Sequence, residues 1–175
     1  PNINMREADV LIEATDHPAE NLVGRSLSPI AIAAYGSQEL IDRDTRAGIL
    51  PGGEDNIWVD YLADSEMSRV SRRLRAAHAA NARIHVRNHS LLLQLEAVRQ
   101  GLGYAFLPCI LAESDPGLLR VGNIPPVLGP SMWMLTHPDL RSTRRVKVFM
   151  DFVRDIFDRR AHELLGSELN GPSQA

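Results

Sequence analysis

His85 and His89 are four residues apart, the spacing at which two histidines on one helix face can bind a metal ion. The surrounding residues do not predict a helix there, because "RIHVRN" (83–88) has the character of a strand and His89 stands at a helix start. No cysteine pair lies nearby to complete a metal site. We therefore expect neither a metal ion nor a cofactor.

The single cysteine, Cys109, is the only thiol that could act as a nucleophile. It follows Pro108 at the end of an apolar run, and nothing near it in sequence would lower the thiol pKa. A small buried side chain is therefore the favoured interpretation. One cysteine also excludes an internal disulfide and favours a reducing compartment. The chain has no Gly-x-Ser-x-Gly motif, and no catalytic set of residues emerges from the sequence.

Charged side chains gather on two predicted helices. On the last helix, three aspartates alternate with three arginines: Asp151, Asp155, Asp158, Arg154, Arg159 and Arg160. This spacing favours a solvated, ion-paired face over acid/base catalysis. The helix at 65–80 carries arginines around Arg72. The net charge of the chain is −3, so a solvated face is favoured over DNA contact here too.

The stretch "NHSLLLQLEAVRQGLGYAFLP" (88–108) predicts a binding surface. Asn88 or Ser90 can cap a helix with one apolar face, and Gly101 can close that helix in the left-handed conformation. The N–H groups at the start of such a helix have no partner within it, and they favour a negative charge. Asn88, His89 and Ser90 would therefore present donors to an anion.

The remaining elements follow from apolar periodicity and turn residues. Strands are predicted at 8–15, 28–36, 57–63, 83–88, 104–107, 117–129 and 131–138. Helices are predicted at 37–43, at 65–80, between Ser90 and Gly101, and at 142–165, with Ser37 and Ser65 as N-caps of the first two. Strands that alternate with helices predict an α/β fold, in which ligands bind at the carboxyl ends of the strands. No apolar run is long enough to span a membrane.

Three of these helices have an apolar stripe that should face the core. The expected buried residues are Met67, Val70, Leu74 and Ala77 on the second helix, Leu91, Leu92, Leu95 and Val98 on the third, and Val146, Phe149, Val153, Ile156 and Phe157 on the last. The strand at 8–15 has a continuous apolar centre, so we expect it to be covered on both faces.

Three stretches of the chain resemble, in order, the effector-binding domain of LysR-type transcriptional regulators: "READVLIEATDHPAENLVGRSLSPIAIAAYGSQEL", "LEAVRQGLGYAFLP" and "WMLTHPDLRSTRRVKVFMDFV". The similarity runs from about Arg6 to Phe157, and the last two stretches are the more specific. The resemblance implies two Rossmann-like lobes joined by two crossing strands, a periplasmic-binding-protein-like (type II) fold. Lobe one would comprise 1–34 and 132–166, lobe two 35–131, and a disordered tail 167–175.

The resemblance also implies a function. The chain would be the effector-sensing and dimerising domain of a cytoplasmic, DNA-binding regulator, with a small and often anionic metabolite between its lobes. The implied effector-binding residues are Asn88, His89, Ser90, Thr15, Asp16, Asp60 and Pro108. The implied partners are the effector and a second copy of the chain, with a tetramer possible in the full-length protein, and no membrane.

Two departures from the family pattern concern the start of the chain. It begins at Pro1 rather than methionine, and the winged helix-turn-helix, through which the family contacts DNA, and the start of lobe one are missing from the printed sequence. We therefore expect a fragment that does not read an operator by itself. Two alternatives share the architecture: a periplasmic solute-binding protein of a transport system, which would need an export signal, and an enzyme, which would need a nucleophile or acid/base pair in the cleft.

Overall fold

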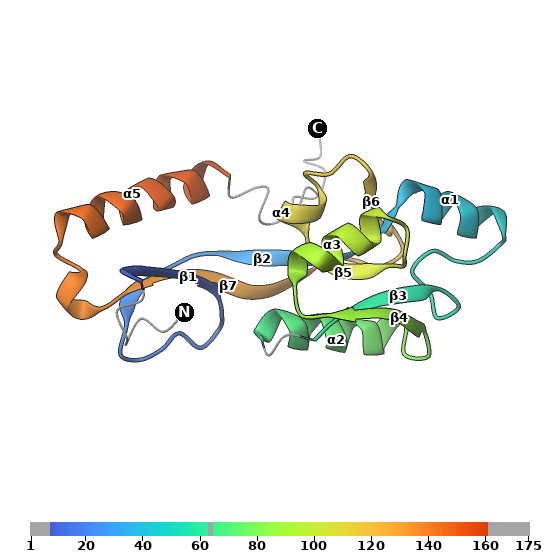
Figure 1. Ribbon diagram of the computed structural model, residues 1–175, viewed down its shortest axis with the longest axis horizontal. Helices are drawn as coiled ribbons and strands as arrows, with labels where there is room; N and C mark the ends of the chain where they lie inside the picture. Colours follow the sequence, from blue (N-terminus) through green and yellow to red (C-terminus); the bar gives the residue numbers. More distant parts are fainter. Residues whose placement is uncertain (1–7, 63–64, 161–175) are drawn as a thin grey trace, which may run out of the picture.

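The computed structural model describes residues 8–62 and 65–160 (Figure 1). The strands are β1 (Val10–Ala14), β2 (Val23–Ser37), β3 (Ile57–Tyr61), β4 (Arg83–Asn88), β5 (Ala105–Pro108), β6 (Leu118–Arg120) and β7 (Val127–Thr136). The helices are α1 (Gln38–Arg46), α2 (Glu66–His78), α3 (Leu91–Arg99), α4 (Cys109–Ala112), the 3₁₀ turn η2 (Pro138–Leu140) and α5 (Arg144–Arg159). The predicted α/β class is confirmed.

Two long strands, β2 and β7, run through the middle of the molecule (Figure 1). They pair with each other antiparallel from Val23 opposite Thr136 to Ile32 opposite Val127. At one end β7 also pairs with β1, and at the other end β2 pairs with β5 and β6. We call the part with β1 and α5 lobe one and the part with α1, α2, α3 and β3 to β6 lobe two. The strands β2 and β7 are thus the two predicted crossing strands, whereas the predicted residue boundaries of the lobes remain a prediction.

In lobe two, β3, α2 and β4 form a βαβ unit with parallel strands. An isolated parallel bridge between Trp58 and Tyr104 joins β3 to the start of β5. Helix α2 lies on one face of β3 and β4, and α3 lies on the opposite face (Figure 1). This arrangement places the N-termini of α2 and α3 beside the carboxyl ends of β3 and β4.

The serine caps and the closing glycine occur where the sequence predicts them. The side chains of Ser37, Ser65 and Ser90 accept hydrogen bonds from the N–H groups of the third helical residue of α1, α2 and α3. Gly101 adopts a φ of 71°, the left-handed conformation that ends α3. These signals are local, because a cap is made by residues three positions apart.

The last two predicted strands have different boundaries in the structure. Strand β6 ends at Arg120 and β7 begins at Val127, whereas the sequence predicts one strand over 117–129 and another from 131. The break lies at the turn before Val127, where Pro125 and Pro126 cannot donate ladder hydrogen bonds. Residue 130 is also a proline, but it lies within β7 next to a register shift, where a missing donor is tolerated.

Several predictions of burial are wrong. Leu92 is 69% exposed and Phe149 is 46% exposed, and Ala77 is also exposed. Strand β1 is only partly buried along its length. In α3 the other predicted positions face the core: Val98 is buried, and Leu91 and Leu95 are partly buried against it, next to Gln94 and Ala97. The predicted end of the last helix, at 161–165, and the predicted tail lie outside the described residues.

Candidate ligand-binding site

The carboxyl ends of β3 and β4 bring predicted site residues of lobe two together. Tyr61, next to Asp60, is in register with Asn88, and the N–H of Leu62 donates a 2.8 Å hydrogen bond to the carbonyl of Asn88. Helix α3 starts just beyond Asn88, and α2 starts shortly after β3. The site thus has two helix N-termini at one sheet edge, an arrangement that favours anions.

Asn88 connects the end of β4 to the start of α3. Its Oδ1 accepts a 3.1 Å hydrogen bond from the N–H of Ser90, whose hydroxyl in turn caps α3. The Nδ2 of Asn88 is buried and has no hydrogen-bond partner among the described residues. A buried donor without a partner is costly, so a ligand oxygen at this place would lower the energy of the folded protein. His89, between these two residues, is exposed.

Thr15 and Asp16 follow β1 and lie beside the crossing strand β7. The Thr15 N–H donates to the carbonyl of Ser131 at 2.9 Å, and the Ser131 N–H donates to Asp16 Oδ1 at 3.3 Å. The Thr15 hydroxyl also accepts a hydrogen bond from the His17 N–H at 3.0 Å. We call Thr15 to His17 the crossover turn. These contacts hold it against a crossing strand, as the resemblance implies.

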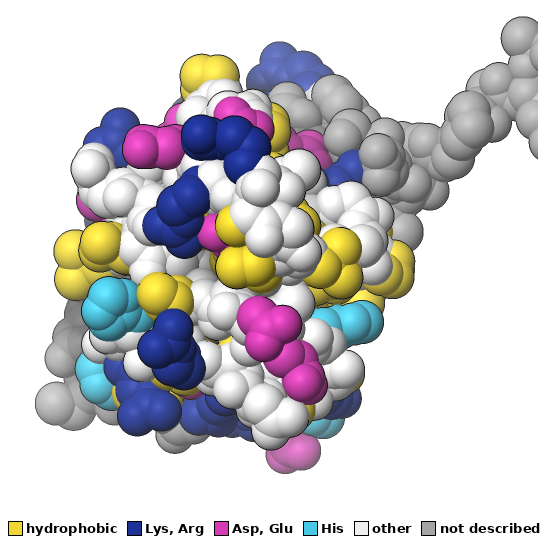
Figure 2. Space-filling view, turned by 90° about the vertical axis from the view of Figure 1, so that its right-hand side faces the viewer, with side chains coloured by type: hydrophobic (Ala, Val, Ile, Leu, Met, Phe, Trp, Pro, Cys, Tyr) yellow, Lys and Arg dark blue, Asp and Glu magenta, His cyan; other side chains and the backbone are white. Residues whose placement is uncertain are grey.

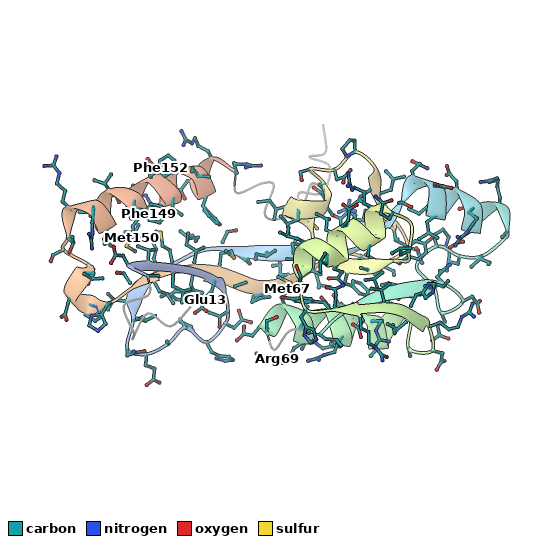
Figure 3. The ribbon with its side chains drawn as sticks, viewed as in Figure 1. Glu13, Met67, Arg69, Phe149, Met150 and Phe152 are labelled. Carbon is teal, nitrogen blue, oxygen red and sulfur yellow. The ribbon has the colours of Figure 1, made fainter. Side chains whose placement is uncertain are left out.

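Glu66, in the first turn of α2, joins the crossover turn to lobe two. Its Oε1 accepts a 3.1 Å hydrogen bond from the Thr15 hydroxyl, and its Oε2 accepts a short hydrogen bond from the Asp16 N–H. Figure 3 places Glu13 of β1 on one side of this junction and Met67 and Arg69 of α2 on the other. The two groups of predicted residues, at the crossover turn and at the sheet edge, are therefore linked through α2.

Two predicted residues lie in the protein interior. Asp60 is 5% exposed, and its carboxylate lies 3.7 Å from Arg75 and accepts a hydrogen bond from the Tyr61 N–H. The contact with Arg75 attaches α2 to β3. Pro108 is buried at the end of β5, opposite Ile32 of the crossing strand β2.

Sequence reasoning missed Glu66. An acidic residue in the first turn of a helix usually stabilises the helix dipole, and that is all its sequence position indicates. Its contact with Thr15 spans 51 residues, so it depends on how the two lobes meet. The only local signal is that Glu66 directly follows the N-cap of α2. This end of the helix lies next to the crossover turn.

Two hollows that are open to solvent lie elsewhere, along α5. One, of about 700 Å³, is lined by Arg144, Arg145, Val148, Phe149 and Phe152. The other, of about 950 Å³, lies between residues 18–25, the end of β7 and α5. Neither contains any of the predicted site residues.

The other chemistry-bearing residues behave as structural groups. Cys109 is fully buried, and burial raises the pKa of its thiol. On α5, Arg154 forms ion pairs with Asp151, Asp155 and Asp158, which confirms the predicted ion-paired face. Within residues 8–62 and 65–160, no cluster of three potential metal ligands occurs and no helix could span a membrane.

Figure 2 shows the end of lobe two, where α1 and neighbouring loops lie. On this face, Lys and Arg side chains are interspersed with Asp and Glu side chains. The mixture matches the small net charge of the chain, −3. This face therefore lacks the one-sided positive field with which proteins attract nucleic acid.

Solved structures of LysR-type regulators share this fold. The effector domain of AmpR of Pseudomonas aeruginosa is 16% identical with a TM-score of 0.68, over 93% of this chain and 77% of that chain. CrgA from Neisseria meningitidis is 16% identical with a TM-score of 0.71, over 89% of this chain and 54% of that chain, so the chain spans about half of CrgA. The CcmR regulatory domain of Synechocystis PCC6803, in complex with 2-PG, is 12% identical with a TM-score of 0.64, over 89% of this chain and 76% of that chain.

Identities this low establish the fold alone, and no curated protein sequence matches the chain. The sequence profile of the LysR substrate binding domain, whose fold is the periplasmic-binding-protein-like type II fold, matches residues 2–158. Because this match covers most of its length, the chain belongs to the LysR substrate binding domain family.

Proposed function

We propose that the chain is the effector-sensing and dimerisation domain of a DNA-binding transcriptional regulator that acts in the cytoplasm. The observation that carries this proposal is the family match over residues 2–158. An effector binds between the lobes and favours one arrangement of them. The DNA-binding part of the intact regulator responds, because the effector has a different affinity for each arrangement.

The effector of this proposal is a small anion. The helix N-termini of α2 and α3 attract negative charge, and Asn88 supplies a side-chain donor that has no partner among the described residues. Asn88, His89 and Ser90 contact the effector from lobe two, and Thr15 and Asp16 contact it from the crossover turn. Asp60 and Pro108 hold these elements in place from the interior. CcmR, which was solved with 2-PG, supports a small-molecule ligand for a domain of this fold.

Self-association is the second part of the proposal. Leu92 and Leu93 of α3 are 69% and 61% exposed, and Val148 and Phe152 of α5 are 61% and 58% exposed. Large apolar side chains exposed next to each other favour a protein contact. Because α3 belongs to lobe two and α5 to lobe one, these patches fit a dimer in which lobe one of one copy faces lobe two of the other.

The effector proposal is tested by the thermal stability of the chain with a panel of small anionic metabolites that includes 2-PG. A ligand that binds only the folded state raises Tm as its concentration increases. The informative variant is Asn88→Asp, which keeps the acceptor for the Ser90 N–H and replaces the free donor by a negative charge. Asn81→Asp is the matched control, because Asn81 is exposed and lies at the opposite end of β4.

We expect Asn88→Asp to abolish the ligand-induced rise in Tm and Asn81→Asp to keep it. A panel in which no anion raises Tm contradicts the anionic effector. A ligand that binds both variants equally well places the site away from Asn88.

A further inference from the structure

The side-chain carboxylate of Glu66 is bound by the crossover turn as a ligand would be. One oxygen accepts from the Thr15 hydroxyl and the other from the Asp16 N–H, so both oxygens of the carboxylate have a donor from lobe one. Two donors that converge on the two oxygens of one carboxylate form a specific binding geometry. The Glu66 side chain is only 14% exposed, although it stands at the end of a helix.

The charges around this contact hold the carboxylate in place. Glu66 lies in the first turn of α2, where the helix dipole favours a negative charge. Arg69, one turn further along, lies 3.9 Å from Glu66 Oε1. The Asp16 carboxylate is occupied elsewhere, because it accepts from the Ser131 N–H. The negative charge at the donors of the crossover turn is therefore that of Glu66.

We propose that Glu66 is an internal competitor of the effector: its carboxylate occupies the donors of Thr15 and Asp16, and an anionic effector reaches them only by displacing it. This inference rests on the function proposed above. It also assigns a chemical class, because donors that fit the Glu66 carboxylate select a carboxylate group on the effector. Displacement breaks the contact between the crossover turn and α2, so binding and lobe rearrangement are one event.

The test uses acetate, the smallest carboxylate with a methyl group, and hydrogen exchange of the Asp16 amide. Glu66→Ala removes the internal carboxylate and leaves the donors open. We expect the Asp16 amide to exchange at least about tenfold faster in this variant, since it loses its acceptor. Acetate at millimolar concentration should restore its protection in a saturable manner, while the wild-type amide should not respond to acetate.

Two further variants control this experiment. Glu39→Ala removes a first-turn acid from α1, where Glu39 is exposed, and it should leave the Asp16 amide unchanged. Adding Thr15→Val to Glu66→Ala removes the second donor and should weaken the acetate effect about tenfold. If Glu66→Ala does not fold, Glu66→Ser serves instead, because the serine side chain is too short to reach the Asp16 N–H and is well tolerated at a helix start.

The inference fails if acetate does not restore protection in a folded Glu66 variant, or if acetate acts equally on the wild type. This result is independent of the proposed function, because it needs no effector. Finding an effector that raises Tm while acetate has no effect would refute the competitor role alone. Conversely, acetate could restore protection while no metabolite of the panel raises Tm. That result would support Glu66 as a competitor for carboxylates and contradict the proposed anionic effector.

Discussion

The Tyr104 hydroxyl donates a 3.0 Å hydrogen bond to the carboxylate of Asp44, 60 residues away in the chain. The same carboxylate oxygen accepts from Asn56 Nδ2 at 2.7 Å, and Arg43 contacts the other oxygen. Asp44 is 3% exposed, and the three donor side chains offset the cost of burying its carboxyl group. The network ties α1 and the loop before β3 to the residue that precedes β5. Burial, and then the hydrogen bond to Asp44, raises the pKa of the Tyr104 hydroxyl, which keeps it a donor.

Removing this network should destabilise lobe two in two graded steps. Tyr104→Phe keeps the ring and deletes one donor, and should lower the free energy of unfolding by about 1–2 kcal/mol. Asp44→Ala leaves buried donors without an acceptor and should cost about 3–5 kcal/mol. Asp42→Ala, at an exposed position of the same helix, should change the free energy of unfolding by less than about 0.5 kcal/mol. Urea unfolding curves measure all three, and equal effects of Asp42→Ala and Asp44→Ala would contradict the assignment.

The two faces of α5 should respond differently to truncation. Val153 is 7% exposed, so Val153→Ala should lower the free energy of unfolding by about 2 kcal/mol. Phe149→Ser, at a side chain that is 46% exposed, should cost only about 1 kcal/mol despite the larger deletion. Figure 3 shows Phe149 and Phe152 on this helix. The measurement is denaturant unfolding at protein concentrations below those at which the chain self-associates. A larger loss of stability in Phe149→Ser than in Val153→Ala would mean that Phe149 faces the core, as the sequence predicts.

Two glycines at positive φ compare backbone strain alone, at Gly48, with strain plus crowding, at Gly103. Gly48 has a φ of 72° with no atom within 4 Å of an added Cβ, so Gly48→Ala should cost about 1 kcal/mol. At Gly103 an added Cβ would lie 2.7 Å from the carbonyl oxygen of Ile57, in the backbone of β3. Gly103→Ala must therefore displace a strand, and should cost at least about 3 kcal/mol. Thermal unfolding of both variants tests this, and a milder effect at Gly103 would mean that β3 can move aside.

The Cys109 thiol should be unreactive while the protein is folded. Its burial lowers the thiolate fraction, so reaction with a disulfide reagent at pH 8 should be roughly a hundredfold slower than in guanidinium. Because the folded pKa is raised, stability is complete below the unfolded thiol pKa of about 8.5 and falls as pH rises above it. Cys109→Ala should show a smaller decline over this range in pH-dependent urea unfolding. Rapid labelling of the thiol in the native protein would show that the structure around Cys109 opens.

The sequence predicts features that depend on neighbouring residues, such as helix caps, but not the contacts between the two lobes. Ser37, Ser65 and Ser90 cap their helices as predicted, since a cap depends on a few neighbouring residues. The buried face of a helix depends on what packs against it, which is why Leu92 and Phe149 were misplaced. No local sequence signal places Thr15 and Asp16 near lobe two, and only the family resemblance predicts that position. Neither local signals nor the resemblance predicts the role of Glu66, because its hydrogen-bond partner depends on how the two lobes meet.

The paired crossing strands restrict the motions that an effector can use. Strands β2 and β7 are hydrogen-bonded to each other across the junction, so the lobes cannot be pulled apart without breaking that ladder. The register shifts between Ser26 and Ser28 and between Pro29 and Ala31 interrupt it, and at such places a ribbon bends and twists most readily. We therefore expect any rotation of one lobe against the other to concentrate near Pro29. A rotation there would move the tip of each lobe by an amount that grows with its distance from the crossing strands.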